Sequence, residues 1–94
     1  MKKVIVIKKS EGAADFVDLP KINEYRAFQQ SMLEAGRVNI WERSEFVNNE
    51  ATITIICDSA GTYDEITNFS NSLGDWRPGY EIIDEKTFPY DSDH

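Results

Sequence analysis

Residue types that often carry chemistry are scarce in this chain of 94 residues. The only histidine is His94, the last residue, and the only cysteine is Cys57. Histidine is the commonest general base near neutral pH, so histidine catalysis is not expected. A single cysteine cannot form an intrachain disulfide or complete a zinc or redox pair, which favours a reducing compartment. We expect a cytoplasmic protein without a cofactor, in which Cys57 is a buried packing thiol.

Long hydrophobic runs and glycine-rich loops are also missing. The basic start of the chain leads into an apolar run of only Val4 to Ile7 before Lys8 and Lys9 follow. Such a run is too short for a signal peptide or a membrane span, so it is interpreted as a first strand, and no membrane partner is expected. Gly12 and Gly61 are isolated, which excludes a glycine-rich phosphate loop.

Basic charge is nearly absent from the second half of the chain. The net charge is −7; residues 1–44 hold eight basic and six acidic side chains, whereas residues 45–94 hold two basic and eleven acidic ones. The second half would repel phosphate backbones, so nucleic acid is not an expected partner. The tail contains Asp91, Asp93 and His94, which could hold a metal, but a solvated acidic tail is our interpretation and no metal site is predicted.

What remains is the composition of one small globular domain. With 40% hydrophobic and 12% aromatic residues, the chain is expected to form a single domain over residues 1–94, with an acidic tail from about residue 87. A domain of this size buries only about 60 to 65 per cent of the surface exposed by its unfolded chain. Dimerisation is a natural supplement to so thin a core.

Hydrophobic periodicity and turn residues predict four strands and two helices. The apolar stripes and capping signals indicate a helix from about Leu19 to Ala35, ended by Gly36, and a second from a capping box at Thr62–Glu65 to Gly74. Asn48-Asn49 is predicted to be a tight turn between two strands. The predicted strands are 3–8, 38–47, 51–57 and 80 to 84 or a little beyond, and the tail can add a short extended piece through Phe88 and Tyr90.

The order β-α-β-β-α-β has the split β-α-β arrangement as its simplest solution. We therefore predict an α+β, ferredoxin-like fold with a four-stranded antiparallel sheet in the order 4-1-3-2. Both helices are expected on one face of the sheet, which leaves the other face open.

The hairpin of residues 38–57 raises the question of which way Trp41 points. A two-residue turn at Asn48-Asn49 would place Trp41 opposite Ile56 and Arg43 opposite Thr54. Because Ile53, Ile55 and Cys57 form the more apolar side of their strand, that side should face the helices. This register predicts Trp41 and Arg43 on the open face and leaves Glu42 at the margin of the helical layer.

A small-molecule site is predicted around the two tryptophans. An arginine two residues from a tryptophan on one strand face can bind the carboxylate of a planar ligand while the indole stacks on it. Trp76 and Arg77, from the loop before the last strand, would line the rim of such a site. The predicted ligand-binding residues are Trp41, Arg43, Thr54, Ile56 and Trp76, and no catalytic residue is predicted.

The element order, the length and the hairpin AGRVNIWERSEF…ATITIICDS resemble those of the dimeric α+β barrel superfamily. The resemblance covers residues 1 to about 88 and implies a homodimer in which two ferredoxin-like chains pack sheet against sheet and enclose a pocket in each. It also implies relatives that include cofactor-free monooxygenases and isomerase-like proteins.

Three functions are compatible with these observations. The first is a binding or interaction module whose homodimer takes a small planar or acidic ligand. The second is a cofactor-free oxygenase or isomerase in which Trp41 and Arg43 position the substrate beside a pocket of at least about 300 Å³. The third is an acidic inhibitor of a basic partner site, which requires the acids of the second half to form one continuous surface.

Overall fold

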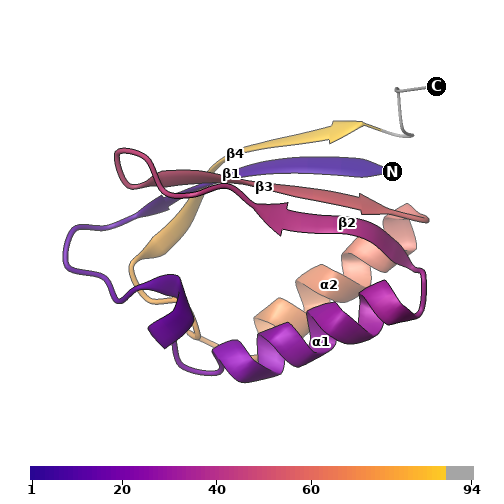
Figure 1. Cartoon of the computed structure of the whole chain (residues 1–94), viewed down its shortest axis with the longest axis horizontal. Coiled ribbons are helices and arrows are strands. Elements are labelled where there is room, and N and C mark those ends of the chain that lie inside the picture. Colours follow the sequence, from indigo (N-terminus) through magenta and orange to yellow (C-terminus); the bar gives the residue numbers. More distant parts are fainter. Residues whose placement is uncertain (89–94) are drawn as a thin grey trace.

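The protein folds as a four-stranded antiparallel sheet with both helices against one face (Figure 1). The computed structural model describes residues 1–88, so Tyr90 and the tail with Asp91, Asp93 and His94 lie outside the described residues. The sheet order is β2-β3-β1-β4, which confirms the ferredoxin-like prediction. Its elements are β1 (Lys2–Lys9), the 3₁₀ turn η1 (Phe16–Asp18), α1 (Ile22–Glu34), β2 (Val38–Arg43), β3 (Glu50–Cys57), α2 (Ala60–Ser72) and β4 (Tyr80–Phe88).

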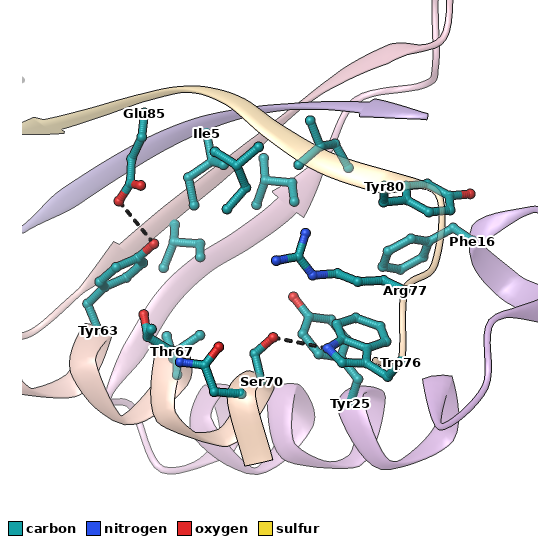
Figure 2. A pocket seen from close by; sticks show the side chains of 16 residues that line it. Ile5, Phe16, Tyr25, Tyr63, Thr67, Ser70, Trp76, Arg77, Tyr80 and Glu85 are labelled. Carbon is teal, nitrogen blue, oxygen red and sulfur yellow. Dashed lines mark hydrogen bonds between the residues drawn. The ribbon is translucent and has the colours of Figure 1, made fainter. Parts of the chain in front are cut away.

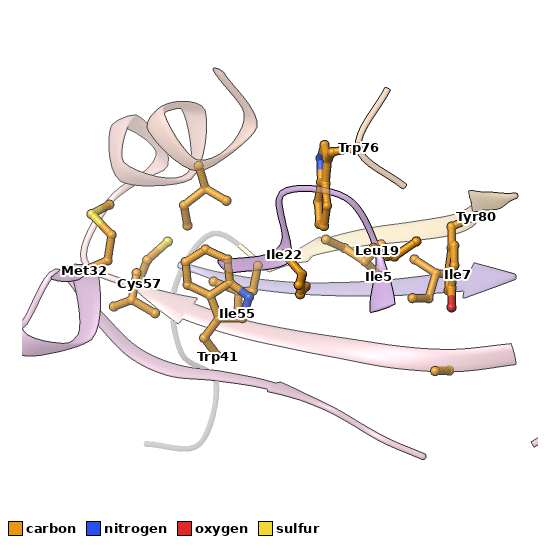
Figure 3. Close-up of a cluster of buried hydrophobic side chains, with 13 residues drawn as sticks. Ile5, Ile7, Leu19, Ile22, Met32, Trp41, Ile55, Cys57, Trp76 and Tyr80 are labelled. Atoms are coloured by element: carbon orange, nitrogen blue, oxygen red, sulfur yellow. The ribbon is translucent and has the colours of Figure 1, made fainter. Parts of the chain in front are cut away.

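The core lies between the sheet and the helices (Figure 3). In β1, Ile5 and Ile7 are buried towards the helices, whereas Val4 and Val6 are half-buried on the open face. Val4 and Val6 therefore place apolar surface on the face that no helix covers, where an antiparallel strand commonly carries polar side chains. The buried cluster also contains Leu19, Ile22, Met32, Val38, Trp41, Ala51, Ile55, Cys57, Ile66, Trp76 and Tyr80.

Both helices start elsewhere than predicted. α1 begins at Ile22 rather than near Leu19, because Lys21 before it has a left-handed φ of 64° that interrupts the helix. α2 begins at Ala60, and its N-cap is Ser59, whose hydroxyl accepts a hydrogen bond from the Thr62 amide. The predicted capping box at Thr62–Glu65 is therefore wrong, since it lies inside the helix.

The hairpin between β2 and β3 has the predicted turn but not the predicted register. Asn48 and Asn49 adopt left-handed φ values of 55° and 66°, and Val47 bridges Glu50 across them. Further from the turn, however, Trp41 pairs with Ile55 and Arg43 with Ile53. Residues 44–46 therefore contain one more residue than the facing part of β3. Such a bulge reverses which side chains point to each face of the sheet.

As a result, the prediction that Trp41 lies on the open face is wrong. Trp41 is 8% exposed beneath α1, while Glu42 points to the open face and is exposed. Arg43 is on the helical side, at the sheet edge, where its guanidinium carbon lies 4.9 Å from the centre of the Phe46 ring. Burying an indole contributes several kcal/mol, at roughly 25 cal/mol per Å², and the bulge also keeps the Glu42 carboxylate in water. The burial of Trp41 and the hydration of Glu42 together stabilise the bulge, and the bulge ends β2 at Arg43.

A second register shift decides which β4 side chains face the helices. β4 continues past Asp84 to Phe88, within the extension predicted for it, and its pairing with β1 shifts between Val6 and Ile7. Ile7 pairs with Ile82, but Ile5 pairs with Glu85. The extra residue directs both Ile82 and Glu85 towards the helical side of the sheet.

Within residues 1–88, neither helix has the length and apolar character that a membrane crossing requires.

The observed hairpin register predicts unequal effects of truncation on its two faces. Trp41→Ala should lower the free energy of unfolding by about 3–5 kcal/mol, because it leaves a cavity under α1. Ile56→Ala, on the half-buried open face, should cost only about 1 kcal/mol when measured at a protein concentration at which the chain is monomeric. Urea denaturation monitored by circular dichroism measures both. A larger effect of Ile56→Ala would contradict the observed register.

Candidate functional site

A pocket of about 370 Å³ lies between the sheet and α2 (Figure 2). One wall is the helical side of the sheet and the opposite wall is one face of α2. The strand wall is almost entirely isoleucine, whereas polar groups lie on α2 and at the two ends. The strand residues that line the pocket are Ile5, Ile7, Ile53, Ile55, Tyr80, Ile82 and Glu85.

The α2 wall explains why this space is not filled by the chain itself. The lining residues of α2 follow the i, i+3, i+4, i+7, i+8 spacing of one helical face. Of these, Thr67, Ser70 and Asn71 have short polar side chains and are half-buried or exposed. They do not extend to the sheet, so the volume above them stays open. The complete α2 set is Tyr63, Ile66, Thr67, Ser70 and Asn71.

An aromatic cluster closes one end of the pocket. The rings of Trp76 and Tyr25 stack with centroids 4.6 Å apart and an interplanar angle of 24°. The Trp76 indole donates a hydrogen bond of 3.0 Å to the Ser70 hydroxyl, which links the loop before β4 to α2. Phe16 packs edge-on against Tyr25, Trp76 and Tyr80 at 6.1–6.2 Å. Edge and offset contacts of this kind stabilise a rigid wall.

Tyr25 connects this wall to β2. Its hydroxyl accepts a hydrogen bond of 3.1 Å from the Trp41 indole, and the two rings meet edge-on at 5.6 Å. Burial raises the pKa of Tyr25 from its usual 10.0 to about 12, so the phenol stays protonated at neutral pH. Trp41 therefore orients a neutral hydroxyl that borders the pocket.

Arg77 brings a positive charge into this mostly apolar space. Its side chain is half-buried, and in Figure 2 the guanidinium lies between the isoleucines of the sheet and the Trp76 end. Arg77 takes part in none of the ion pairs or side-chain hydrogen bonds formed within the described part of the chain. A guanidinium that has lost part of its hydration without gaining a protein partner favours an anionic ligand.

The opposite end carries a carboxylate. Glu85 Oε1 accepts hydrogen bonds from Lys3 Nζ at 2.7 Å and from the Tyr63 hydroxyl at 3.4 Å. The Lys3 ammonium also lies 4.6 Å from the centre of the Tyr63 ring. Burial, and then the charge of Glu85, raise the pKa of Tyr63 to about 12, so its hydroxyl acts as a donor.

The structure divides the ligand-binding residues predicted from the sequence into three places. Trp41 and Arg43 line a smaller cleft of about 220 Å³ under the β2 edge, together with Arg26 and Gln29. Trp76 lines the larger pocket. The remaining two, Thr54 and Ile56, alternate with the inward residues of β3 and so lie on the open face.

Tyr25, Tyr63 and Glu85 line the larger pocket but were not predicted to belong to a site. Tyr25 and Tyr63 were interpreted only as members of apolar helical stripes, and their hydroxyls gave no sign of facing a pocket. Glu85 follows Asp84 directly, and only the shift between β1 and β4 decides which of the two carboxylates points inwards. The polar residues on the inner face of α2 were the one available signal.

Other chemical groups of the described chain offer no additional site. Cys57 is 2% exposed on the helical side, and burial raises the pKa of its thiol, as a packing role requires. Within residues 1–88, no three histidine, cysteine, aspartate or glutamate side chains gather in a metal-binding arrangement. Comparisons with protein-family models, curated proteins and solved structures find no match.

The raised pKa of Tyr25 predicts a loss of stability in alkali. The phenol ionises more readily in the unfolded chain, so the free energy of unfolding should fall by about 2–3 kcal/mol between pH 10 and 12 on account of this group. At pH 7, Tyr25→Phe should cost about 1–3 kcal/mol, because the Trp41 indole loses its acceptor. The difference between the two proteins should therefore shrink from pH 10 to 12 in urea denaturation. A constant difference would contradict the raised pKa.

Proposed function

We propose that this protein is a small binding module whose larger pocket takes a small planar acid. The main support is Arg77, a half-buried residue whose guanidinium borders apolar walls and pairs with no described carboxylate. The volume of about 370 Å³ lies within the range of small-molecule sites. The isoleucine wall and the stacked indole of Trp76 suit a flat apolar body, while Arg77 meets its carboxylate.

This site differs from the one predicted around Trp41 and Arg43. The enzyme alternative assigned those two residues to substrate positioning and needs a pocket of at least about 300 Å³ beside them. The cleft there has about 220 Å³, so we favour binding over catalysis. The single cysteine and the absence of other reactive clusters in the described residues also fit a binding protein of the cytoplasm.

We do not propose the third alternative, an acidic inhibitor. It requires the acids of β4, α2 and the tail to form one surface, but among the described residues Glu81 and Asp84 lie on the open face whereas Glu85 faces the helices. In addition, Glu65 and Glu85 are engaged by Arg37 and Lys3.

We further propose that the open sheet face joins two copies of the chain, as the resemblance to the dimeric α+β barrel superfamily implies. Trp41 contributes nothing to that face, so the support comes from its cross-strand rows. One row runs Glu42-Thr54-Val4-Lys86, and the next runs Ile40-Ile56-Lys2-Phe88, in the order β2-β3-β1-β4.

Each row is complementary to the same row of a second chain when that row is placed opposite it in reversed order. A twofold axis parallel to the strands and between two facing sheets reverses the order of each row. Glu42 would then lie opposite Lys86 of the partner subunit, and Ile40 opposite Phe88 of the partner subunit. Ile40 and Phe88 are each 38% exposed in the single chain, so the pairing would cover apolar surface.

The acid-binding proposal predicts that 2-naphthoate binds and that its neutral counterpart, 2-naphthylmethanol, binds at least about tenfold more weakly. Arg77→Gln should weaken 2-naphthoate by about tenfold or more and should leave the alcohol unaffected. Isothermal titration calorimetry measures the four combinations.

Arg43→Gln provides the comparison with the smaller cleft. Weakening by Arg43→Gln and not by Arg77→Gln would move the ligand to the cleft beside Trp41 and overturn the proposal. Equal affinities for acid and alcohol would also overturn it.

The dimer proposal predicts a mass of twice the 10.8 kDa chain in light scattering at micromolar concentration. Glu42→Lys should weaken association by about tenfold or more through like-charge contact, and adding Lys86→Glu should restore it. Glu24→Lys, at an exposed position of α1, is the control and should leave association unchanged. A monomer of the unaltered chain at all concentrations would contradict the dimer.

A further inference from the structure

The two ends of the larger pocket have opposite polarity. The Trp76–Tyr25 stack lies at one end, from which the Arg77 side chain extends towards the middle of the pocket, and Glu85 and Tyr63 lie at the other end (Figure 2). A ligand that binds only Arg77 would make no contact with the Glu85 end of the larger pocket.

One oxygen of the Glu85 carboxylate is available to accept a hydrogen bond. Both of its hydrogen bonds, from Lys3 and from Tyr63, go to Oε1. Its second oxygen, Oε2, takes no hydrogen bond from any residue of the described chain. An ionised carboxylate has about four lone-pair positions, so Oε2 can accept a further hydrogen bond.

The existing bonds also keep this acceptor in place. The Lys3 ammonium holds Glu85 from the strand side, and the Tyr63 hydroxyl holds it from α2. A carboxylate fixed from two sides loses little conformational freedom when a ligand binds, which strengthens each contact it makes.

The length of the slot follows from α2. Tyr63 and Ser70 line opposite ends and are two helical turns apart, so they are separated by about 10 Å along the helix axis. Ile66 lies between them, facing Ile5 and Ile55 of the sheet. The central section is therefore apolar on the side of the sheet, while Thr67 adds one hydroxyl on the side of α2.

We propose that the ligand is a rigid, planar acid about 10 Å long that carries a hydroxyl or amino group at the end opposite its carboxylate. The carboxylate binds Arg77, the flat body lies between Ile66 and the isoleucines of the sheet, and the distal group donates a hydrogen bond to Glu85 Oε2. This inference rests on the proposed function and adds the distal donor to it.

The test compares three probes by isothermal titration calorimetry: 2-naphthoate, 6-hydroxy-2-naphthoate and 3-hydroxy-2-naphthoate. The distal hydroxyl of the 6-isomer should give affinity about tenfold higher than that of 2-naphthoate, as expected for a hydrogen bond to a charged acceptor. The 3-isomer has its hydroxyl beside the carboxylate and should show no such gain.

Two matched variants assign the gain to Glu85. Glu85→Met keeps the side-chain length but removes the acceptor, so the advantage of the 6-isomer should fall below about twofold. Lys3→Met breaks the same ion pair yet keeps the carboxylate, so the advantage should persist. Because both variants lose the Lys3–Glu85 contact, a general loss of stability would affect them alike.

The outcomes separate this inference from the proposed function. If 2-naphthoate does not bind, or binds independently of Arg77, the proposed acid site fails. If 2-naphthoate binds through Arg77 but the 6-isomer has no advantage, or keeps it in Glu85→Met, the acid site stands and the distal donor is overturned.

Discussion

The bulge at residues 44–46 is the constraint on which the aromatic end of the larger pocket depends. By inserting one residue between the Asn48-Asn49 turn and Arg43, it directs Trp41 under α1 instead of to the open face. The Trp41 indole then donates to Tyr25, and the Tyr25 ring stacks on Trp76. Without this change of face, Tyr25 would lose its hydrogen-bond donor, and the aromatic wall would have no link to β2.

A thin sheet-and-helix sandwich of this size has little core to spare for a cavity. The chain retains one by concentrating its aromatic rings at one end of the helical layer, where Phe16, Tyr25, Trp76 and Tyr80 pack on one another. Phe28 and Phe69 stack at 4.1 Å and hold α1 against α2. Between these rigid contacts, the short side chains of α2 leave an open slot whose ends are fixed by Arg77 and Glu85. Charges of opposite sign therefore border the two halves of the larger pocket, Arg77 in a half-buried position and Glu85 in an exposed one.

Much of the fold could be predicted because local signals agreed with it. The apolar run from Val4 to Ile7 indicated the first strand, and Gly36 and Gly74, with left-handed φ values of 73°, end the helices where expected. The helix starts were less predictable, since Ser59 and Thr62 are both good capping residues and only the hydrogen bond between them decides which one caps. Of the candidate site, Trp76 and Arg77 were singled out as rim residues, whereas Tyr25, Tyr63 and Glu85 were not.

The sequence by itself determined the order of elements, the sheet topology that this order favours and the tight turn at Asn48-Asn49, because these follow from periodicity and from local backbone preferences. The apolar side of β3 with Ile53, Ile55 and Cys57 was correctly predicted to face the helices, whereas only the tertiary structure decided which faces the residues of β2 and β4 occupy. A single inserted residue reverses that choice, and its free energy depends on what packs against the strand: α1 over Trp41, and α2 opposite Glu85. These partners are distant in the sequence, so the site became visible only once the chain was folded.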